Sequence, residues 1–216
     1  MIKCINFLFS IYFNIRYLPL RQALHLPIYV NFFSLGHCKI KRGQLVLSQC
    51  ARGIVKLGLG KSPGMQSFKT CIYLGKNSIV LFGGRAIIAQ GTVLRCDEGA
   101  TISIGDNFYC NCNCYIRSTQ SITFGNDCSV GWNVVMNTSD GHKVWHDGKI
   151  IKMDGPITIG NHVWLTSNCS ILKNVAIPDD NIIANNALVN KIFTQCHCLI
   201  GGVPARIIKT NVDWQA

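Results

Sequence analysis

Acidic residues are scarce in this chain, which has 10 Asp and Glu among 216 residues against 21 Lys and Arg. The resulting net charge of +11 favours partners that carry negative charge, such as polyanions, acidic membranes or phosphorylated ligands. Charged residues of both signs make up only 14% and hydrophobic residues 48%, a balance that excludes an intrinsically disordered chain. The sequence has neither a long block of like charges nor a nucleic-acid-binding signature, so we expect no nucleic-acid partner.

An uninterrupted apolar stretch of about 20 residues, which a membrane-spanning helix needs, is also missing. The segment 1–35 is apolar and aromatic, but polar residues and two prolines interrupt it, and no small-x-small cleavage site marks a signal peptide. Two interpretations remain open. The segment packs on the main domain, or it forms a helix on an anionic membrane face with Lys3, Arg16 and Arg21 near the headgroups.

A disulfide framework is not indicated, although the chain has 12 cysteines. Such frameworks belong to small secreted domains, and these cysteines are scattered at apolar positions of a longer chain. Cys110, Cys112 and Cys114 alternate as residues on one face of a strand do, so we expect small core residues in a reducing compartment. A metal site at Cys-x-Cys-x-Cys is the minor alternative, because no second ligand pair at zinc spacing follows.

What the chain does have is an apolar repeat of six residues. A helix would place residues six apart about 240° round its axis, so it could not bury all of them on one face. Short strands joined by corners of Gly, Asn or Asp can bury every sixth residue on one side. Three such six-residue units form one triangular coil, which must stack on other coils to cover its apolar face. The apolar residues that recur every six positions are clearest near the C-terminal end, and a step of six also occurs within residues 104–136. The clearest series is Ile159, Leu165, Ile171, Ile177, Ile183 and Val189.

Departures from an 18-residue coil predict where the chain leaves the stack. Ile159 and Ile177 lie 18 residues apart, which is one coil. Ile104 and Phe124 lie 20 residues apart, which predicts a bulge of two residues. Phe124 and Ile159 lie 35 residues apart, which predicts a loop of 17 extra residues within about 137–156. This loop contains two histidines, and the apolar period stops within it.

Four segments carry motifs beyond the plain repeat: FYCNCN (108–113), SDGHKVWH (139–146), PITIGNHVWL (156–165) and GGVPARIIK (201–209). In this order they resemble motifs of the hexapeptide-repeat acyltransferases, and most closely those of the sugar O-acetyltransferase branch. The resemblance covers most of the chain from about residue 36 and implies an all-β fold, the left-handed parallel β-helix, with a loop ejected from one coil. It divides the chain into an apolar extension, the β-helix acyltransferase domain and a C-terminal tail, at residues 1–35, 36–204 and 205–216.

The resemblance also implies an acetyl-CoA-dependent O-acetyltransferase for a sugar hydroxyl of a capsule or O-antigen repeat. It implies a cytoplasmic homotrimer, at the inner face of the plasma membrane, with sites at subunit boundaries and no metal. His142 matches the general base for direct transfer, because a sugar hydroxyl attacks a thioester well only if its proton is removed. Asp140 orients the imidazole or caps a turn, and Asn111 and His146 match acceptor-side positions. The residues that match the acetyl-CoA path, with the last two as phosphate ligands, are Trp164, Ser167, Asn185, Lys191 and Arg206.

Departures from the family motifs keep other functions open. The usual Trp-Ile-Gly reads Trp-Leu-Thr at 164–166, and bulkier corner residues at 184–187 line the expected CoA groove. A non-catalytic β-helix binding protein is therefore one alternative. A zinc enzyme of the γ-carbonic-anhydrase type is another, and it would need three histidines to meet across a subunit boundary. The candidates here are His142, His146 and His162, whose spacings are unlike those of that family. Within acetyl transfer, an amino-sugar N-acetyltransferase would use the same base.

Overall fold

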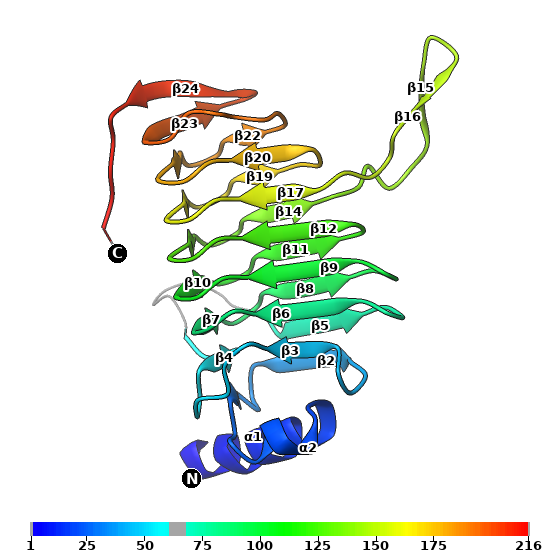
Figure 1. Ribbon diagram of the computed structural model, residues 1–216, viewed down its shortest axis with the longest axis vertical. Coiled ribbons are helices and arrows are strands. Elements are labelled where there is room, and N and C mark those ends of the chain that lie inside the picture. The colour runs from blue at the N-terminus through cyan, green and yellow to red at the C-terminus, as the bar shows by residue number, and fades with distance from the viewer. Residues whose placement is uncertain (1, 61–67, 216) are drawn as a thin grey trace.

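Three parallel sheets surround a common core and form a β-helix (Figure 1). The structure is a computed structural model that describes residues 2–60 and 68–215; residues 1, 61–67 and 216 of the predicted domains lie outside the described part. Apart from a hairpin of β15 and β16, the strands from β1 to β22 enter the first, second and third sheets in turn. The chain is therefore built from stacked triangular coils, as the six-residue period predicted.

The bounds of the elements follow the order of the sheets. The first sheet contains β1 (Ile28–Val30), β4 (Val55–Leu57), β7 (Ala86–Ile88), β10 (Phe108–Cys110), β13 (Ser129–Val130), β18 (Trp164–Leu165), β21 (Ile182–Ile183), β23 (Cys198–Gly202) and β24 (Ala205–Thr210). The second contains β2 (Leu35–Lys39), β5 (Thr70–Leu74), β8 (Val93–Cys96), β11 (Tyr115–Ser118), β14 (Val135–Asn137), β19 (Ser170–Ile171) and β22 (Leu188–Val189). The third contains β3 (Leu45–Leu47), β6 (Ile79–Phe82), β9 (Thr101–Ile104), β12 (Ser121–Phe124), β17 (Ile157–Ile159) and β20 (Val175–Ile177). Outside these sheets lie α1 (Ile2–Tyr17), α2 (Leu20–Ala23), β15 (Val144–His146) and β16 (Lys149–Ile151).

The register of the third sheet confirms the spacing predicted from the sequence. Phe124 pairs with Ile104 on one side and with Ile159 on the other, and Ile159 pairs with Ile177. All four side chains point inward and are at most 2% exposed. Burial of an aliphatic side chain contributes about 1.5–3 kcal/mol, so each coil is held mainly by the inward residues that set the period.

The chain turns at three corners, which are named here by the sheets they connect. Asn107 (φ 55°) and Asp127 (φ 58°) adopt left-handed backbone at predicted corners, a conformation that Asn and Asp tolerate better than most residues. The first corner, between the first and second sheets, includes residues 111–113, 131–133, 166–168 and 184–186. The second corner, between the second and third sheets, includes 119–120, 138–156, 172–174 and 190–191. The third corner leads back to the first sheet and includes 105–107, 125–127, 160–162 and 178–180.

Both ends of the stack differ from the predicted boundaries at residues 36 and 204. Strand pairing begins at Ile28, because β1 pairs with β4, and it ends at Thr210, because β24 pairs antiparallel with β23. The first coil is hard to see in the sequence because its apolar and aromatic surroundings mask the six-residue period. Helix α1 packs against β1 at the N-terminal end (Figure 1). Neither α1 nor α2, the helices of the described ranges, is long and apolar enough to cross a bilayer.

All twelve cysteines are free thiols. Cys110, Cys112 and Cys114 are at most 1% exposed, which confirms their prediction as small core residues. Burial raises the pKa of Cys96 and of Cys128 to about 11, so these thiols stay protonated near neutral pH. The buried cysteines therefore act as small apolar residues within the coils.

Candidate active site

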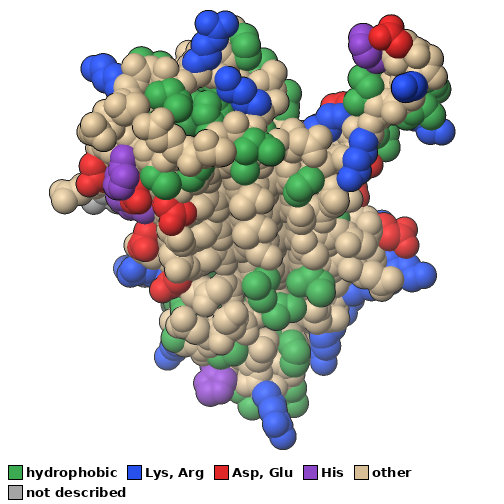
Figure 2. Space-filling view, turned by 45° about the horizontal axis from the view of Figure 1, so that its top comes forward, with side chains coloured by type: hydrophobic (Ala, Val, Ile, Leu, Met, Phe, Trp, Pro, Cys, Tyr) green, Lys and Arg blue, Asp and Glu red, His purple; other side chains and the backbone are tan. Residues whose placement is uncertain are grey.

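A long loop leaves the coil at the second corner and returns to it. The backbone N–H of Gly155 donates to the carbonyl oxygen of Thr138 at 2.9 Å, and Ser139 and Asp154 form an antiparallel bridge just beyond. The chain then runs out into the antiparallel hairpin of β15 and β16, which projects from the stack (Figures 1 and 2). The predicted interruption at 137–156 is therefore this loop, with its base at residues 138 and 155.

His142 lies between the loop base and β15, and its side chain is exposed. Within the described residues its imidazole makes neither a hydrogen bond nor an ion pair, so no described group occupies its ring nitrogens. His146 lies at the end of β15 with 77% of its side chain exposed, and its Nε2 is 3.4 Å from Asp147 Oδ2. The loop therefore carries both histidines outward, and no contact within the described residues joins one to the other.

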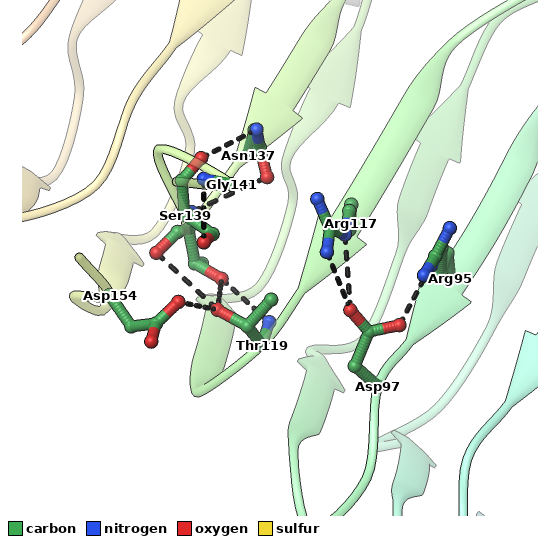
Figure 3. A network of polar contacts seen from close by, with 9 residues as sticks. Arg95, Asp97, Arg117, Thr119, Asn137, Ser139, Gly141 and Asp154 are labelled. Carbon is green, nitrogen blue, oxygen red and sulfur yellow. Dashed lines mark hydrogen bonds and ion pairs between the residues drawn. The ribbon is translucent and has the colours of Figure 1, made fainter. Parts of the chain in front are cut away.

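Hydroxyl and carboxylate groups hold the base of the loop (Figure 3). Thr119 Oγ1 donates to Asp154 Oδ1 at 2.8 Å, and Thr138 Oγ1 accepts the Thr119 backbone N–H at 2.7 Å. Ser139 Oγ accepts the backbone N–H of Gly141 at 3.1 Å. Hydrogen bonds from Ser139 and Thr119 hold the pKa of Asp154 below its ordinary value of 3.8, so the charged carboxylate is the form that closes the loop.

Asp140 contacts a lysine. Its carboxylate forms an ion pair with Lys173 Nζ, which also donates to the carbonyl oxygen of Lys152 at 2.6 Å. Lys173 therefore ties the outgoing and returning arms of the loop to the next coil. Lys173 was not among the residues predicted from the sequence, although its spacing of 35 residues from Thr138 equals the predicted step between these two coils. An orienting role of Asp140 towards His142 stays a prediction.

Removal of the Asp154 carboxylate is expected to loosen the loop without unfolding the coils. Asp154→Ala removes a hydrogen bond where the loop joins the coil. The variant should therefore speed amide exchange in residues 139–154 by roughly fivefold, as measured by hydrogen–deuterium exchange. Asp154→Asn, which keeps one acceptor oxygen for Thr119, is the matched control. Because the folded-state pKa is lowered, closure is fully stabilised above pH 3.8 and is lost as pH falls through the lower folded-state pKa. Unchanged exchange in Asp154→Ala would contradict the assigned role.

Three predicted site residues lie in the first corner, namely Asn111, Ser167 and Asn185. The backbone N–H of Asn111 donates to Val130 at 2.8 Å, and that of Asn186 donates to Ser167 at 3.3 Å, so the corners of successive coils stack. Asn185 is exposed, whereas Ser167 is only 6% exposed. The corner is narrow: a Cβ on Gly131 would lie 2.7 Å from the backbone nitrogen of Ser167. This column of stacked first-corner residues therefore leaves Asn111 and Asn185 open to solvent to a greater extent than Ser167, which is nearly covered.

Trp164 lies on the outer face of the first sheet, outside that column. It is 37% exposed, and its ring lies 5.7 Å from the ring of Trp214. Trp214 also stacks on His162 at 4.5 Å and donates from Nε1 to the His162 carbonyl oxygen at 2.9 Å. The C-terminal tail thus covers part of the surface next to a predicted CoA residue, a contact that the sequence analysis did not foresee.

The two predicted phosphate ligands lie apart from each other in sequence and in the fold. Lys191 is exposed and follows β22 at the second corner, where strand register places it one coil beyond Lys173. Arg206 is exposed on β24, opposite Gly201. Lys191 therefore shares the corner that carries the loop of His142, whereas Arg206 lies at the C-terminal end of the first sheet.

The histidines required by the zinc alternative do not meet within one chain. His142 and His146 lie on the loop of the second corner, whereas His162 lies at the third corner with its Nδ1 3.0 Å from Asp180 Oδ1. Across residues 2–60 and 68–215, no three His, Cys, Asp or Glu side chains are grouped to hold a metal ion. No histidine group of this kind therefore exists within the described part of one chain.

The chain is similar to several acetyltransferases. It is 34% identical over 120 residues to the galactoside O-acetyltransferase of Escherichia coli K12, a match that covers 53% of this chain and 57% of that protein. It is 29% identical over 141 residues to the polysialic acid O-acetyltransferase of Escherichia coli O1:K1, covering 64% of this chain and 39% of that protein. It is 31% identical over 133 residues to a Dictyostelium discoideum protein named "Putative acetyltransferase", covering 60% of this chain and 68% of that protein. No family model matches the chain.

A solved structure of a galactoside acetyltransferase in complex with coenzyme A superposes with a TM-score of 0.52 at 30% identity, covering 62% of this chain and 65% of that chain. Fold and similarity together define a left-handed parallel β-helix of six-residue repeats, which confirms the predicted fold class. The chain belongs to the hexapeptide-repeat acetyltransferase family. It spans 57% and 39% of the first two relatives named above, or about half of their length.

Proposed function

We propose that the protein transfers the acetyl group of acetyl-CoA to a hydroxyl group of a sugar in a capsule or O-antigen repeat. The observation that carries the proposal is the anchored loop, which presents an exposed histidine in a chain of the acetyltransferase family. The names of two relatives, which specify galactoside and polysialic acid as acceptors, support a sugar as the acceptor.

In the proposed step His142 is the general base. An imidazole nitrogen takes the proton of the sugar hydroxyl as the hydroxyl oxygen attacks the thioester carbonyl, and the carbon–sulfur bond then breaks. The imidazolium returns the proton to the leaving sulfur, so the products are a sugar acetyl ester and free CoA. Such proton transfer typically accelerates a reaction by about 10²–10⁴-fold.

A complete site requires two copies of the chain. Asn111 lies in the first corner and His142 on the loop of the second, and the intervening face of about six residues is roughly 20 Å wide. In the proposed homotrimer each site combines the first corner of one copy with the loop of its neighbour. We further propose a cytoplasmic location, with residues 1–35 in contact with the inner face of the plasma membrane.

Lys191 is expected to bind a phosphate group of acetyl-CoA. Loss of a charge-assisted hydrogen bond should raise the KM for acetyl-CoA about tenfold in Lys191→Gln. The same variant should leave the KM for acetyl-pantetheine, which lacks the nucleotide phosphates, unchanged. Lys76→Gln, at an exposed lysine of the second corner near the other end of the stack, is the matched control. An equal loss with both thioesters would refute a phosphate contact.

The proposed activity is tested with purified protein, acetyl-CoA and purified bacterial surface glycans. We expect free CoA to appear only when an acceptor is present, together with an acetyl group that hydroxylamine removes from the glycan. A hydroxylamine-resistant acetyl group on an amino sugar would assign N-acetylation. Absence of CoA release with every glycan, from protein that remains folded, would count against acetyl transfer.

A further inference from the structure

Helix α1 turns three uncharged polar side chains towards the protein. Asn14 Nδ2 donates to the Ile28 carbonyl oxygen at 2.6 Å, and Asn14 Oδ1 accepts the Ile28 backbone N–H at 3.1 Å. Ser10 Oγ accepts the backbone N–H of Val30 at 2.9 Å, and Asn6 Oδ1 accepts that of Phe32 at 3.0 Å. These three residues are spaced four apart, so they form one stripe along the helix.

The inward stripe has a structural reason. Strand β1 is the last strand of the first sheet on the N-terminal side, so its outer edge has no neighbouring strand. Buried backbone groups at such an edge need hydrogen-bond partners, and the side chains of Asn14 and Ser10 supply them to Ile28 and Val30. Asn6 binds the exposed backbone N–H of Phe32 just beyond the strand. The helix therefore caps the stack with its polar side.

The opposite stripe of α1 is apolar and uncovered. Leu8, Tyr12 and Ile15 are 65%, 55% and 48% exposed. Among the described residues, nine of the 23 large exposed hydrophobic side chains lie within residues 1–35, which include α1 and α2. Single exposed apolar residues are ordinary on a protein surface, but a continuous helical stripe of them marks a contact surface.

The charge of the chain is segregated along the stack. Residues 1–96 contain 13 of the 21 Lys and Arg and no Asp or Glu; all 10 acidic residues lie from Asp97 onward. Because each coil stacks on the previous one, position in the sequence becomes height along the β-helix. The end that carries α1 is therefore basic, and its arginines lie against the helix: Arg42 donates to the Ile15 carbonyl oxygen at 2.5 Å, and the Arg52 guanidinium lies 5.6 Å from the Phe7 ring centre.

We infer that α1 lies flat in the interface of an anionic lipid bilayer, with Leu8, Tyr12 and Ile15 among the upper acyl chains and the surrounding Lys and Arg at the headgroups. Apolar burial and attraction to anionic lipid together are what bind such helices. A second copy of the chain is the less suitable occupant, because two such ends carry the same charge and repel each other. This inference does not depend on the proposed acetyl transfer.

If α1 lies on the membrane, the height of the His142 loop above the bilayer limits which sugars it can reach. This step, unlike the membrane contact, rests on the proposed function. Strand β13 lies four coils beyond β1 in the first sheet, and the loop of His142 follows in that coil. With about 4.8 Å between neighbouring strands, the loop leaves the stack roughly 20 Å from the membrane end. A bound protein would therefore act on sugars several residues along a chain that projects from its lipid anchor.

The test is flotation of the full chain with lipid vesicles. We expect partition into vesicles with about one third phosphatidylglycerol to exceed partition into pure phosphatidylcholine at least ~10-fold, and to fall at high salt. Leu8→Glu/Ile15→Glu should lower partition at least ~10-fold, whereas the matched control Ile150→Glu/Ile208→Glu, with two exposed isoleucines elsewhere, should bind as the wild type. Lys3→Gln/Arg16→Gln, which leaves the apolar stripe intact, should weaken binding to anionic vesicles only.

Two results would overturn the inference. One is equal partition into neutral and anionic vesicles, and the other is unchanged vesicle binding of Leu8→Glu/Ile15→Glu. If the oligomeric mass of that variant changes while its vesicle binding does not, the stripe is assigned to a contact between copies. Because vesicle binding needs no acetyl-CoA, its failure would leave the proposed acetyl transfer untouched, and loss of acetyl transfer would leave this test intact.

Discussion

His142→Ala is expected to lower kcat at least ~100-fold, because the sugar hydroxyl then loses the base that removes its proton. The side chain is exposed and makes no contact that the described chain needs for folding, so the melting temperature should stay near that of the wild type. Steady-state release of free CoA measures the effect. Added imidazole should restore part of the rate in the alanine variant, a result that a merely structural role would not produce.

Two further histidines separate catalysis from binding. His25→Ala, at an exposed histidine just after α2, should leave both kcat and KM unchanged. His146→Ala, on the same loop as His142, is expected to raise the KM for the acceptor and to leave kcat nearly intact. A rate for His142→Ala within a few-fold of the wild type, in folded protein that binds acetyl-CoA, would remove His142 from the proposed mechanism.

Mixtures of two inactive variants should regain activity. In the proposed homotrimer, Asn111→Ala damages the first corner and His142→Ala damages the loop, and each site takes one part from each of two neighbouring copies. When equal amounts of the two variants are unfolded and refolded together, about one quarter of the sites should combine two intact parts. The mixture should therefore show about one quarter of the wild-type rate, far above either variant alone.

The comparison needs one control. Two separately refolded variants, mixed only after assembly, should stay inactive unless subunits exchange. A refolded mixture that forms mixed oligomers but has no more activity than the separate variants would mean that Asn111 and His142 of one chain serve the same site. That outcome would contradict the composite site, and it would leave a base role for His142 open to the alanine test.

Spacing carried most of the fold information in the sequence. Residues that the spacing placed one coil apart are partners in neighbouring strands of the structure, as in the series Ile104, Phe124, Ile159 and Ile177. Inward apolar side chains of neighbouring coils must align because they share one core. The loop was visible for the same reason, since extra residues between aligned positions have to leave the stack. The first coil was not visible, because its period is lost among apolar residues that also serve the contact with α1.

The contacts around the candidate site were less predictable. Motif position identified His142 and Asp140 as candidates. The ion pair between Asp140 and Lys173 depends on which corner residues of neighbouring coils lie next to each other, and the apolar period alone does not give this for polar residues. The stacking of Trp214 on His162 joins the C-terminal tail to a corner far away in sequence, and no local pattern encodes it. The polar inner stripe of α1 likewise forms hydrogen bonds to the open edge of β1 and not to residues close to it in sequence.

The most direct measurement of the central proposal is a crystal structure of the protein with CoA bound. We expect the CoA sulfur to lie between the first corner of one copy and the His142 imidazole of a neighbouring copy, within direct or single-water hydrogen-bonding reach of that ring. A bound CoA whose sulfur is beyond that reach from every His142 in the assembly would contradict the account.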